Sequence, residues 1–383
     1  MIIAVDGYEA NIKGRVGIGR YAYEIISHMH AQLASDPGST QVRVYLPTPP
    51  VSDMPKETSF WHYSVRKPSK LWTFIGLPLA LRSDTPAADV LFSPTHYIPR
   101  FTNIPTVMAI MDLSYLVYPS MFRKSDLHKL VHWTRYAATH AARICTISEF
   151  SKNAIIRAYG VPAKSVIVTY PGFSMLNAMI TKDTLEEVLK KHHVSRHFIL
   201  SVGTIQPRKN YERLIEAYAG FLASNKQKFG EIQLVIIGKK GWLYENILEA
   251  PKRFGVDGKV KFLHTVSDND LPYFYQGALC FALPSLYEGF GLPVLEAMAY
   301  KCPVVVSDVS SLPEIAAGAG VYVDPKNVES ITQGLLSAVR QRNLIQGKSR
   351  VQKGLAQVKQ FTWEKAAAQT VEILKEVGGR KHV

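Results

Sequence analysis

The chain has 383 residues, a formal net charge of +14 and 47% hydrophobic residues, which is the composition of a globular protein long enough for two domains. The amino terminus has no basic stretch before an apolar one, so a signal peptide is not expected, and no apolar run reaches the ~18 residues of a membrane span. The three cysteines have neither metal-binding nor pairing spacing, so we expect free thiols in a reducing cytoplasm.

The excess of lysine and arginine indicates an anionic partner. The candidates are nucleic acid, a phospholipid surface and a phosphorylated substrate. No nucleic-acid-binding motif accompanies the charge, so we expect no nucleic acid partner.

Over the first 172 residues short apolar runs alternate with amphipathic segments, which predicts a parallel sheet covered by helices. The first strand is Ile2 to Asp6, and the string that begins at Gly17 and Gly19 opens the first helix in the pattern G-x-G-x-x-A. The next strand, Val42 to Leu46, ends in Pro-Thr-Pro instead of the acid that would bind a ribose. We interpret Gly17 and Gly19 as a loop that approaches a ligand closely, and keep an NAD-dependent oxidoreductase as the alternative enzyme.

Two stretches of this first half have an alternative interpretation at a membrane. Residues 69–82 mix large apolar side chains with Lys70 and Arg82. They predict a helix packed on the sheet or, alternatively, an interfacial helix. Residues 122–143 are rich in basic side chains, with Trp133 and Tyr136 among them, and predict a solvated helix face or a surface for anionic lipid or a phosphate-bearing acceptor. Peripheral contact with the inner face of the membrane through this basic surface is therefore kept beside a cytoplasmic location.

Two further strands, Ala88 to Phe92 and Thr106 to Met111, are each followed by a polar residue that is a candidate for the site. His96 follows the first strand and Asp112 the second. In open α/β sheets ligands bind outside the carboxyl ends of the strands, which is where both side chains would lie.

A break at Tyr170-Pro171-Gly172 ends the first half, and the strand–helix alternation restarts at the strand Phe198 to Val202. We expect an N-terminal domain over residues 1–172, a linker region over 173–194 and a C-terminal domain over 195–361.

The restarted strand leads into a loop that suits a diphosphate. Gly203 and Thr204 begin this loop, and Arg208 and Lys209 stand together before the next helix. An arginine can bind two phosphate oxygens at once, and a lysine adds a compact point charge.

A second loop, EGFGLPVLEAM over residues 288–298, runs from a buried strand into a helix. Gly289 and Gly291 allow the backbone to approach a ligand, and Pro293 is tolerated as the first helical residue. The free N–H groups and the dipole of the helix N-terminus favour an anion such as phosphate. Glu288 and Glu296 bracket the loop, and their carboxylates can accept hydrogen bonds from sugar hydroxyls.

The string EGFGLPVLEAM resembles the signature of the retaining, nucleotide-sugar-dependent glycosyltransferases of family four. The resemblance runs through nearly the whole chain and implies the GT-B fold: two Rossmann-like domains facing a cleft, with a last helix, at about 362–383, that crosses back to the first domain. It also implies transfer of a hexose, mannose or glucose, from a donor of the GDP-mannose or UDP-glucose type. The acceptor would be a hydroxyl of a glycan or a lipid-linked sugar, in polysaccharide, glycolipid or cell-envelope glycan synthesis.

The resemblance also assigns roles to residues. The expected catalytic residues are Arg208, Lys209, Glu288 and Asp112. The expected contacts with the sugar or the acceptor are His96, Asp112 and Gly19. The expected donor-binding residues are Gly17, Gly203, Thr204, Arg208, Lys209, Glu288, Gly289, Phe290, Gly291, Leu292 and Glu296.

One position departs from the family pattern. The family usually has His-Asp-Leu where this chain has Met111-Asp112-Leu113, and methionine cannot act as an acid or a base. Either Asp112 or His96 takes over the polar role, or no side chain is needed there. A non-catalytic protein that binds a sugar nucleotide is the alternative that Met111 suggests.

The string Asp268-Asn269-Asp270 contains Asp-x-Asp, the metal-binding signature of a different glycosyltransferase fold. We interpret it as a helix N-cap with acids in the first turn. Since cationic side chains can stabilise the leaving diphosphate, we expect neither a metal nor a cofactor.

Overall fold

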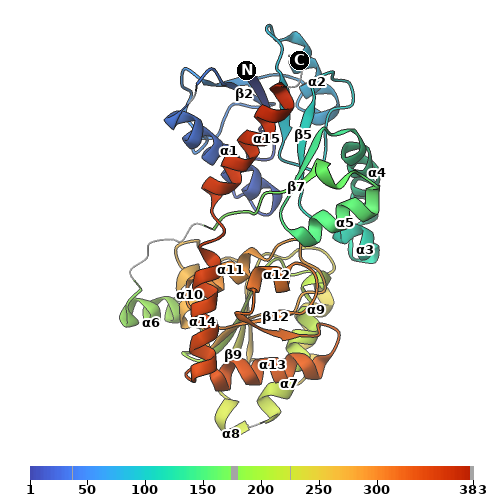
Figure 1. The fold of residues 1–383 in the computed structure, drawn as a ribbon. Coiled ribbons are helices and arrows are strands. Elements are labelled where there is room, and N and C mark those ends of the chain that lie inside the picture. Colours follow the sequence, from blue (N-terminus) through green and yellow to red (C-terminus); the bar gives the residue numbers. More distant parts are fainter. Residues whose placement is uncertain (37, 174–179, 225, 380–383) are drawn as a thin grey trace. The chain divides into compact units, whose positions relative to one another are not determined.

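The structure is a computed structural model that describes residues 1–36, 38–173, 180–224 and 226–379, and it divides into two compact units (Figure 1). The N-terminal unit comprises Met1–Val117, Lys124–Gly172 and Phe361–Val383. The C-terminal unit comprises Tyr118–Arg123 and Phe173–Gln360. Of the predicted linker, residues 174–179 lie outside the described residues, and α6 (Lys182–Lys191) belongs to the C-terminal unit.

The N-terminal unit is built on a parallel sheet whose strands are short, apolar and mostly buried, as expected for strands covered on both faces. The described residues form seven strands in the order β3-β2-β1-β4-β5-β6-β7. The order reverses between β1 and β4, which is where open α/β sheets bind ligands. The strands are β1 (Ile2–Asp6), β2 (Gln41–Leu46), β3 (Trp61–Val65), β4 (Val90–Ser93), β5 (Thr106–Ile110), β6 (Arg143–Thr146) and β7 (Val166–Val168).

Helices cover this sheet, and the last helix of the chain is one of them. The ring of Trp363 lies 6.0 Å from that of Tyr21 on α1, and Glu376 binds Arg143 at 2.8 Å, so α15 packs within the N-terminal unit, as the resemblance implied. The helical segments of this unit are α1 (Ile18–Ser35), η1 (Trp72–Gly76), α2 (Leu77–Ser83), α3 (Ser114–Val117), α4 (Lys124–His140), α5 (Glu149–Tyr159), η3 (Ala163–Ser165) and α15 (Trp363–Gly379).

The predicted helix over 69–82 is only partly correct. It begins at Trp72 and consists of a π-helical turn, η1, followed directly by α2. Leu71 precedes the turn with a φ of 52°, so the first three predicted residues are not helical.

The C-terminal unit repeats the plan with a second parallel sheet. Its described strands lie in the order β10-β9-β8-β11-β12-β13. They are β8 (Phe198–Val202), β9 (Gln233–Ile237), β10 (Val260–Leu263), β11 (Cys280–Leu283), β12 (Val304–Ser307) and β13 (Gly320–Val323). The strand order reverses between β8 and β11, and the loops that follow these two strands carry the residues predicted to bind the sugar-nucleotide donor.

Large apolar side chains from helices on this sheet, such as Tyr211, Phe221 and Leu335, pack against Ile199, Leu234 and their neighbours in one buried core. Besides α6, the helical segments are η2 (Pro119–Met121), η4 (Pro207–Lys209), α7 (Tyr211–Ser224), α8 (Lys226–Phe229), α9 (Glu245–Arg253), α10 (Leu271–Gly277), α11 (Leu292–Ala299), α12 (Leu312–Ala316), α13 (Val328–Gln341) and α14 (Ile345–Val358). Among the residues that the structure describes, none of the helices combines the length and apolar character that crossing a bilayer requires.

Candidate active site

Two loops at the carboxyl edge of the C-terminal sheet bring three of the predicted residues together. Strands β8 and β11 are neighbours, so the loops that leave them lie side by side. Lys209 Nζ lies 2.6 Å from Glu288 Oε1, and Arg208 Nη1 lies 3.2 Å from Glu288 Oε2. Arg208 also donates to the backbone carbonyl of Tyr287. Residues eighty positions apart in the chain thus form one ionic cluster.

Burial and charge in this cluster favour an anionic ligand. Glu288 is 6% exposed and Lys209 is 8% exposed. Burial acts to raise the pKa of the Glu288 carboxyl, but Lys209 and Arg208 overcome it and lower that pKa to about 2. The carboxylate therefore remains ionised at neutral pH. Two cations around one anion leave a net positive charge, which suits the oxygens of a phosphate.

Serine hydroxyls hold the loop that carries Glu288. Ser285 donates to Glu288 Oε1 at 2.7 Å, and Ser310 accepts the backbone N–H of Glu288 at 3.1 Å. Ser311 donates to the carbonyls of Glu288 and Phe290 at 2.9 and 2.8 Å. Sequence reasoning missed these serines, although Ser310 and Ser311 follow strand β12, which is the neighbour of β11, and the rule for strand ends could have found them.

The glycines of the two loops allow a close approach of backbone. Gly291 has a φ of 111°, and a side chain there would lie 2.7 Å from Leu312, so only glycine fits. It is the N-cap of α11, and no side chain caps that helix. Gly203, beside Thr204, has its carbonyl bound by the Tyr211 hydroxyl at 2.9 Å. The loops after β8 and β11 therefore place the backbone of Gly203 and Gly291 at the same edge of the sheet as Arg208 and Lys209.

Glu296 lies in the first turns of α11 and is held by a residue that the sequence did not point to. The hydroxyl of Tyr275, on α10, donates to Glu296 Oε2 at 2.5 Å. The Tyr275 ring is buried and lies parallel to that of Tyr300, with centroids 6.1 Å apart and an interplanar angle of 6°. The orientation of the Glu296 carboxylate is thus set by a side chain that cannot easily move.

The predicted residues of the N-terminal unit gather at the carboxyl edge of its own sheet. His96 Nε2 accepts the backbone N–H of Met111 at 3.1 Å, and Asp112 Oδ1 accepts that of Ser114 at 2.8 Å. Burial lowers the pKa of His96 to about 4, against the opposing effect of the Asp112 carboxylate, so the imidazole is neutral. Since Nε2 accepts, the proton is on Nδ1. His96 therefore stands directly beside Met111, the residue that replaces the family histidine.

The two predicted glycines that follow β1, Gly17 before α1 and Gly19 in its first turn, also lie at this edge. Gly17 has a φ of 53° and is the N-cap of α1, again without a side-chain cap. Gly19 is buried, and a side chain there would lie 3.1 Å from the carbonyl of Glu9. The chain is therefore open at Gly17, which precedes α1, and closely packed at Gly19, which lies in the first turn of α1.

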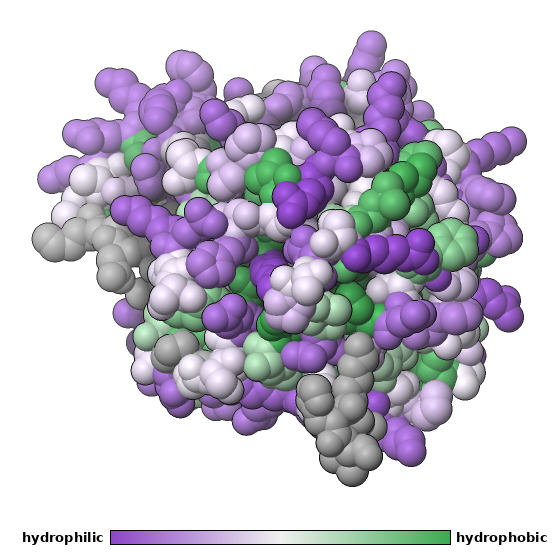
Figure 2. Space-filling model, turned by 90° about the horizontal axis from the view of Figure 1, so that it is seen from above, coloured by the Kyte–Doolittle hydropathy of each residue, from purple (hydrophilic) through white to green (hydrophobic). Residues whose placement is uncertain are grey.

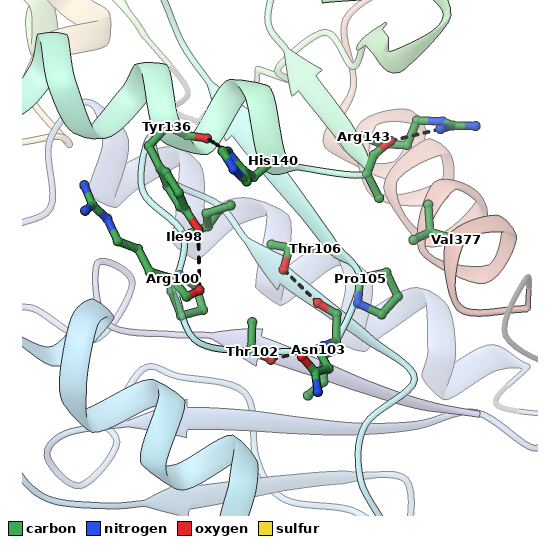
Figure 3. A pocket seen from close by; sticks show the side chains of 13 residues that line it. Ile98, Arg100, Thr102, Asn103, Pro105, Thr106, Tyr136, His140, Arg143 and Val377 are labelled. Carbon is green, nitrogen blue, oxygen red and sulfur yellow. Dashed lines mark hydrogen bonds between the residues drawn. The ribbon is translucent and has the colours of Figure 1, made fainter.

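The cavity drawn in Figure 3 lies at the opposite edge of the N-terminal sheet. It has a volume of about 600 Å³, and Thr106 and Arg143, which begin β5 and β6, line it. The side chains of Arg100 and Arg143 point away from each other, so they do not converge on a single anion (Figure 3). None of the predicted site residues lines this cavity, and we do not assign the active site to it.

The Asp-x-Asp string is partly as predicted. Asp270 is the N-cap residue of α10, but its side chain makes no capping hydrogen bond, and the first turn, which begins at Leu271, contains no acid. Pro272 sets this start, since proline is favoured at the start of a helix. Asp270 is paired with Lys191 at 2.7 Å and His192 at 3.0 Å. Within the described ranges there is no group of three or more His, Cys, Asp or Glu side chains placed to hold a metal ion.

The family model described as glycosyl transferases group 1 matches residues 186–354. The O-antigen chain mannosyltransferase B of Escherichia coli is 32% identical over 289 residues, which are 75% of this chain and 74% of that protein.

Two solved structures show the same fold over almost the whole chain. Sucrose-phosphate synthase from Thermosynechococcus elongatus has a TM-score of 0.71 at 16% identity, covering 99% of this chain and 100% of that one. The Anabaena protein Alr3699/HepE, in complex with UDP and glucose, has a TM-score of 0.72 at 18% identity, covering 98% and 99%. The expected fold class, two Rossmann-like α/β domains of the GT-B type, is confirmed.

Proposed function

This chain belongs to the group 1 glycosyltransferases, and from that premise we propose that it transfers a hexose from a nucleoside diphosphate sugar to an acceptor hydroxyl with retention of the anomeric configuration. The observation that carries the proposal is the cluster of Arg208, Lys209 and Glu288 at the carboxyl edge of the C-terminal sheet. The alternative of an NAD-dependent oxidoreductase falls with the family assignment.

In this proposal the cationic pair stabilises the leaving group. As the bond between the anomeric carbon and the diphosphate breaks, negative charge develops on the diphosphate oxygens beside Arg208 and Lys209. Both side chains are already held in place by Glu288, so they need not reorganise during the reaction. Donors that are positioned in advance usually contribute the largest part of catalysis. The N-terminus of α11 at Gly291 adds its N–H groups to the same anion.

The acceptor oxygen attacks from the face that the diphosphate leaves. The sugar carbon is oxocarbenium-like at that moment, as in glycoside hydrolysis. A bond forms between the acceptor oxygen and the anomeric carbon, and the departing diphosphate takes the acceptor's proton. Glu288 and the backbone of Phe290 and Gly291 hold the sugar hydroxyls, while Glu296 holds the ribose. In the N-terminal unit Asp112, His96 and Gly19 contact the sugar or the acceptor.

The relatives support a choice of donor. A 32% identical relative is named a mannosyltransferase, so GDP-mannose is the first donor to test and UDP-glucose the second. The acceptor is a glycan or a lipid-linked sugar of a cell-envelope polysaccharide or glycolipid. The enzyme is cytoplasmic and makes peripheral contact with the inner face of the membrane through the basic surface of its N-terminal unit.

The test is thermal unfolding of the purified protein with a panel of nucleotide sugars, followed by a transfer assay. A ligand that binds only the native state stabilises it by about 2.7 kcal/mol at 100 times its Kd. We expect one donor to raise the melting temperature and the variant with both Arg208→Ala and Lys209→Ala to lose that rise. The matched control replaces Lys226 and Lys228, two cations on α8 of the same unit. If no nucleotide sugar stabilises the protein, the proposal is wrong.

The non-catalytic alternative rests on Met111. Both an enzyme and a non-catalytic binding protein would bind the donor, so turnover of the donor is the measurement that distinguishes them. Transfer to an acceptor, or slow hydrolysis of the donor by water, supports the enzyme. Donor binding without either reaction would support a binding protein.

A further inference from the structure

The cavity at the amino edge of the N-terminal sheet has no part in the proposed reaction. It has a volume of about 600 Å³, and cavities that bind small molecules usually have roughly 300–1,000 Å³ (Figure 3). Its walls come from the segment between β4 and β5, the end of α4, the first residues of β5 and β6, and Val377 of α15. All of these elements belong to the N-terminal unit, so the cavity is complete within that unit.

One wall of the cavity is aromatic and held in place. The ring of His140 lies on that of Tyr136, with centroids 4.1 Å apart and an interplanar angle of 19°. The guanidinium of Arg100 covers the Tyr136 ring at 4.7 Å, and the Tyr136 hydroxyl donates to the Arg100 carbonyl at 3.4 Å. His140 Nδ1 bonds the Tyr136 carbonyl at 2.8 Å, and a carbonyl can only accept, so Nδ1 carries the proton. Nε2 of the neutral ring is therefore left as a hydrogen-bond acceptor.

The wall opposite these rings offers small polar groups that donate and accept (Figure 3). Thr102 Oγ1 accepts the backbone N–H of Ile104 at 3.1 Å, so its own hydrogen can be donated to a ligand. Thr106 Oγ1 donates to the Ile104 carbonyl at 3.2 Å and keeps its lone pairs. Asn103, which is exposed, adds an amide that donates and accepts. The hydroxyl groups of a sugar also donate and accept, so this set of groups matches a carbohydrate.

The charges around the cavity argue against a metal ion or a phosphate as its ligand. None of the described residues that line it is acidic, so it lacks the carboxylates that hard divalent cations prefer. Arg143 is already paired with Glu376 at 2.8 Å, and Arg100 points away from Arg143. These two cations therefore do not form a pair like Arg208 and Lys209 of the donor site.

The surroundings of the cavity are polar as well. The amino edge of the sheet lies at the end of the unit where Figure 1 marks the amino terminus, and Figure 2 shows the molecule from that end. Hydrophilic side chains predominate on this face, and the apolar patches among them are small. A water-soluble glycan is therefore better suited to this surface than an apolar ligand.

We propose that this cavity is a second carbohydrate site, which binds the acceptor glycan several sugar residues away from its reacting end. The five residues of β5, at ~3.3 Å each, put roughly 16 Å between the two edges of the sheet. One sugar residue cannot span this distance, so only an oligosaccharide reaches both sites. Binding at one point of a chain raises the effective concentration at the other, so longer acceptors should bind more tightly. The inference rests on the proposed function, in which the reacting end lies at the carboxyl edge.

The experiment compares a short and a long acceptor, mannobiose and a soluble mannan fragment, in the transfer assay. We expect the wild-type KM for the fragment to lie about tenfold below that for mannobiose, at similar kcat. Asn103→Ala with His140→Ala should raise the KM for the fragment to that for mannobiose, and leave the KM for mannobiose unchanged. The matched control is His132→Ala with Asn343→Ala, which removes an exposed histidine and an exposed asparagine that do not line the cavity. It should behave as the wild type does.

A second variant and a binding measurement make the test independent of any one substitution and of turnover. Asn103→Trp adds volume at an exposed position of the cavity and should abolish the dependence on acceptor length in the same way. Isothermal titration of the mannan fragment without donor measures binding directly, and both variants should weaken it. Melting temperatures equal to that of the wild type show that the variants are folded.

The outcomes separate this inference from the proposed function. A wild-type KM that does not depend on acceptor length, a dependence that both variants retain, or no binding of the fragment in the titration would overturn the carbohydrate site. Displacement of the fragment by inorganic phosphate would also overturn it, because the cavity would then bind anions. If no nucleotide sugar supports transfer while the fragment binds the wild type and not the variants, the proposed function fails and the carbohydrate site stands.

Discussion

Tyr275 holds Glu296 through a 2.5 Å hydrogen bond from its hydroxyl to Oε2. Burial raises the pKa of the Tyr275 hydroxyl, as does the neighbouring Glu296 carboxylate, so the phenol keeps its proton and acts as a donor. A hydrogen bond to a charged group contributes roughly 1.5–3 kcal/mol. If Glu296 binds the ribose, Tyr275 is a positioning residue for the donor.

We therefore predict that Tyr275→Phe raises the KM for the donor about tenfold and changes kcat little, since the lost energy orients a binding group. Steady-state kinetics with varied donor measures this. The control is Tyr218→Phe, which also removes a buried tyrosine hydroxyl, bonded at 2.5 Å to the Ile232 carbonyl. It should lower stability and leave the KM unchanged. Equal donor KM values in the wild type and Tyr275→Phe would rule out the positioning role.

Because Lys209 is paired with Glu288, variants of the two residues can distinguish the role of Lys209 in stability from its role in catalysis. Lys209→Ala leaves a buried carboxylate with one partner fewer, and breaking a buried pair costs about 3–5 kcal/mol. Adding Glu288→Gln removes the charge, so the double variant should recover much of the melting temperature. It should remain inactive, with a loss of transfer on the order of 10²–10³ as for other electrostatic groups.

Thermal unfolding and transfer assays on the two single variants and the double variant check this prediction. Recovery of transfer together with stability would mean that Lys209 acts only as a structural partner of Glu288.

The same cluster predicts how stability depends on acid. The pKa of Glu288 is lowered from 4.5 to about 2 in the folded protein, so the ionised form stabilises the fold by about 3 kcal/mol. Because the folded pKa is the lower one, this contribution is present above pH 4.5 and is lost as the pH falls towards 2. Urea unfolding of the wild type should show the loss, and Glu288→Gln should show a smaller dependence over the same range. Parallel curves for the two proteins would contradict the assignment.

Chelation provides a further prediction. If Arg208 and Lys209 neutralise the leaving diphosphate, transfer should continue at an unchanged rate in the presence of EDTA. Asp270→Asn should likewise be active, because Asp270 pairs with Lys191 and His192 between α6 and α10. Activity that disappears with EDTA and returns with a divalent cation would show that the reaction needs a metal.

Much of the fold follows from local patterns. Strands β1 and β8 begin and end where short apolar runs meet turn-forming residues, and the sequence predicts both with their observed bounds. Both ends of α5 are set by local signals of the same kind: Ser148 accepts the N–H of Ser151, and Gly160 terminates the helix with a φ of 66°. Caps and apolar runs are properties of neighbouring residues, so they can be read without knowing the tertiary structure.

The rest depends on contacts between distant residues. The π-helical turn at Trp72–Gly76 follows from the packing of Gly76 against Pro68 and of Trp72 against Asp6, which no helical periodicity reveals. The ion pairs of Glu288 and the hydroxyl of Tyr275 join side chains from different loops and helices. The predicted residues were types suited to sugar and phosphate. What the sequence could not show was that one carboxylate binds both cations.

The return of α15 to the N-terminal unit has a consequence for dissecting the protein. Gly172 is packed against the backbone of Trp363, with no room for a side chain, so the end of the first segment and the start of the last helix are in direct contact. A fragment ending at residue 172 would leave the side of α1 around Tyr21 bare and should aggregate. A circular permutant would join the carboxyl terminus to Met1 and open the chain between the two units. Residues 361–383 would then run directly into residues 1–172, so this unit could be expressed separately as one continuous segment.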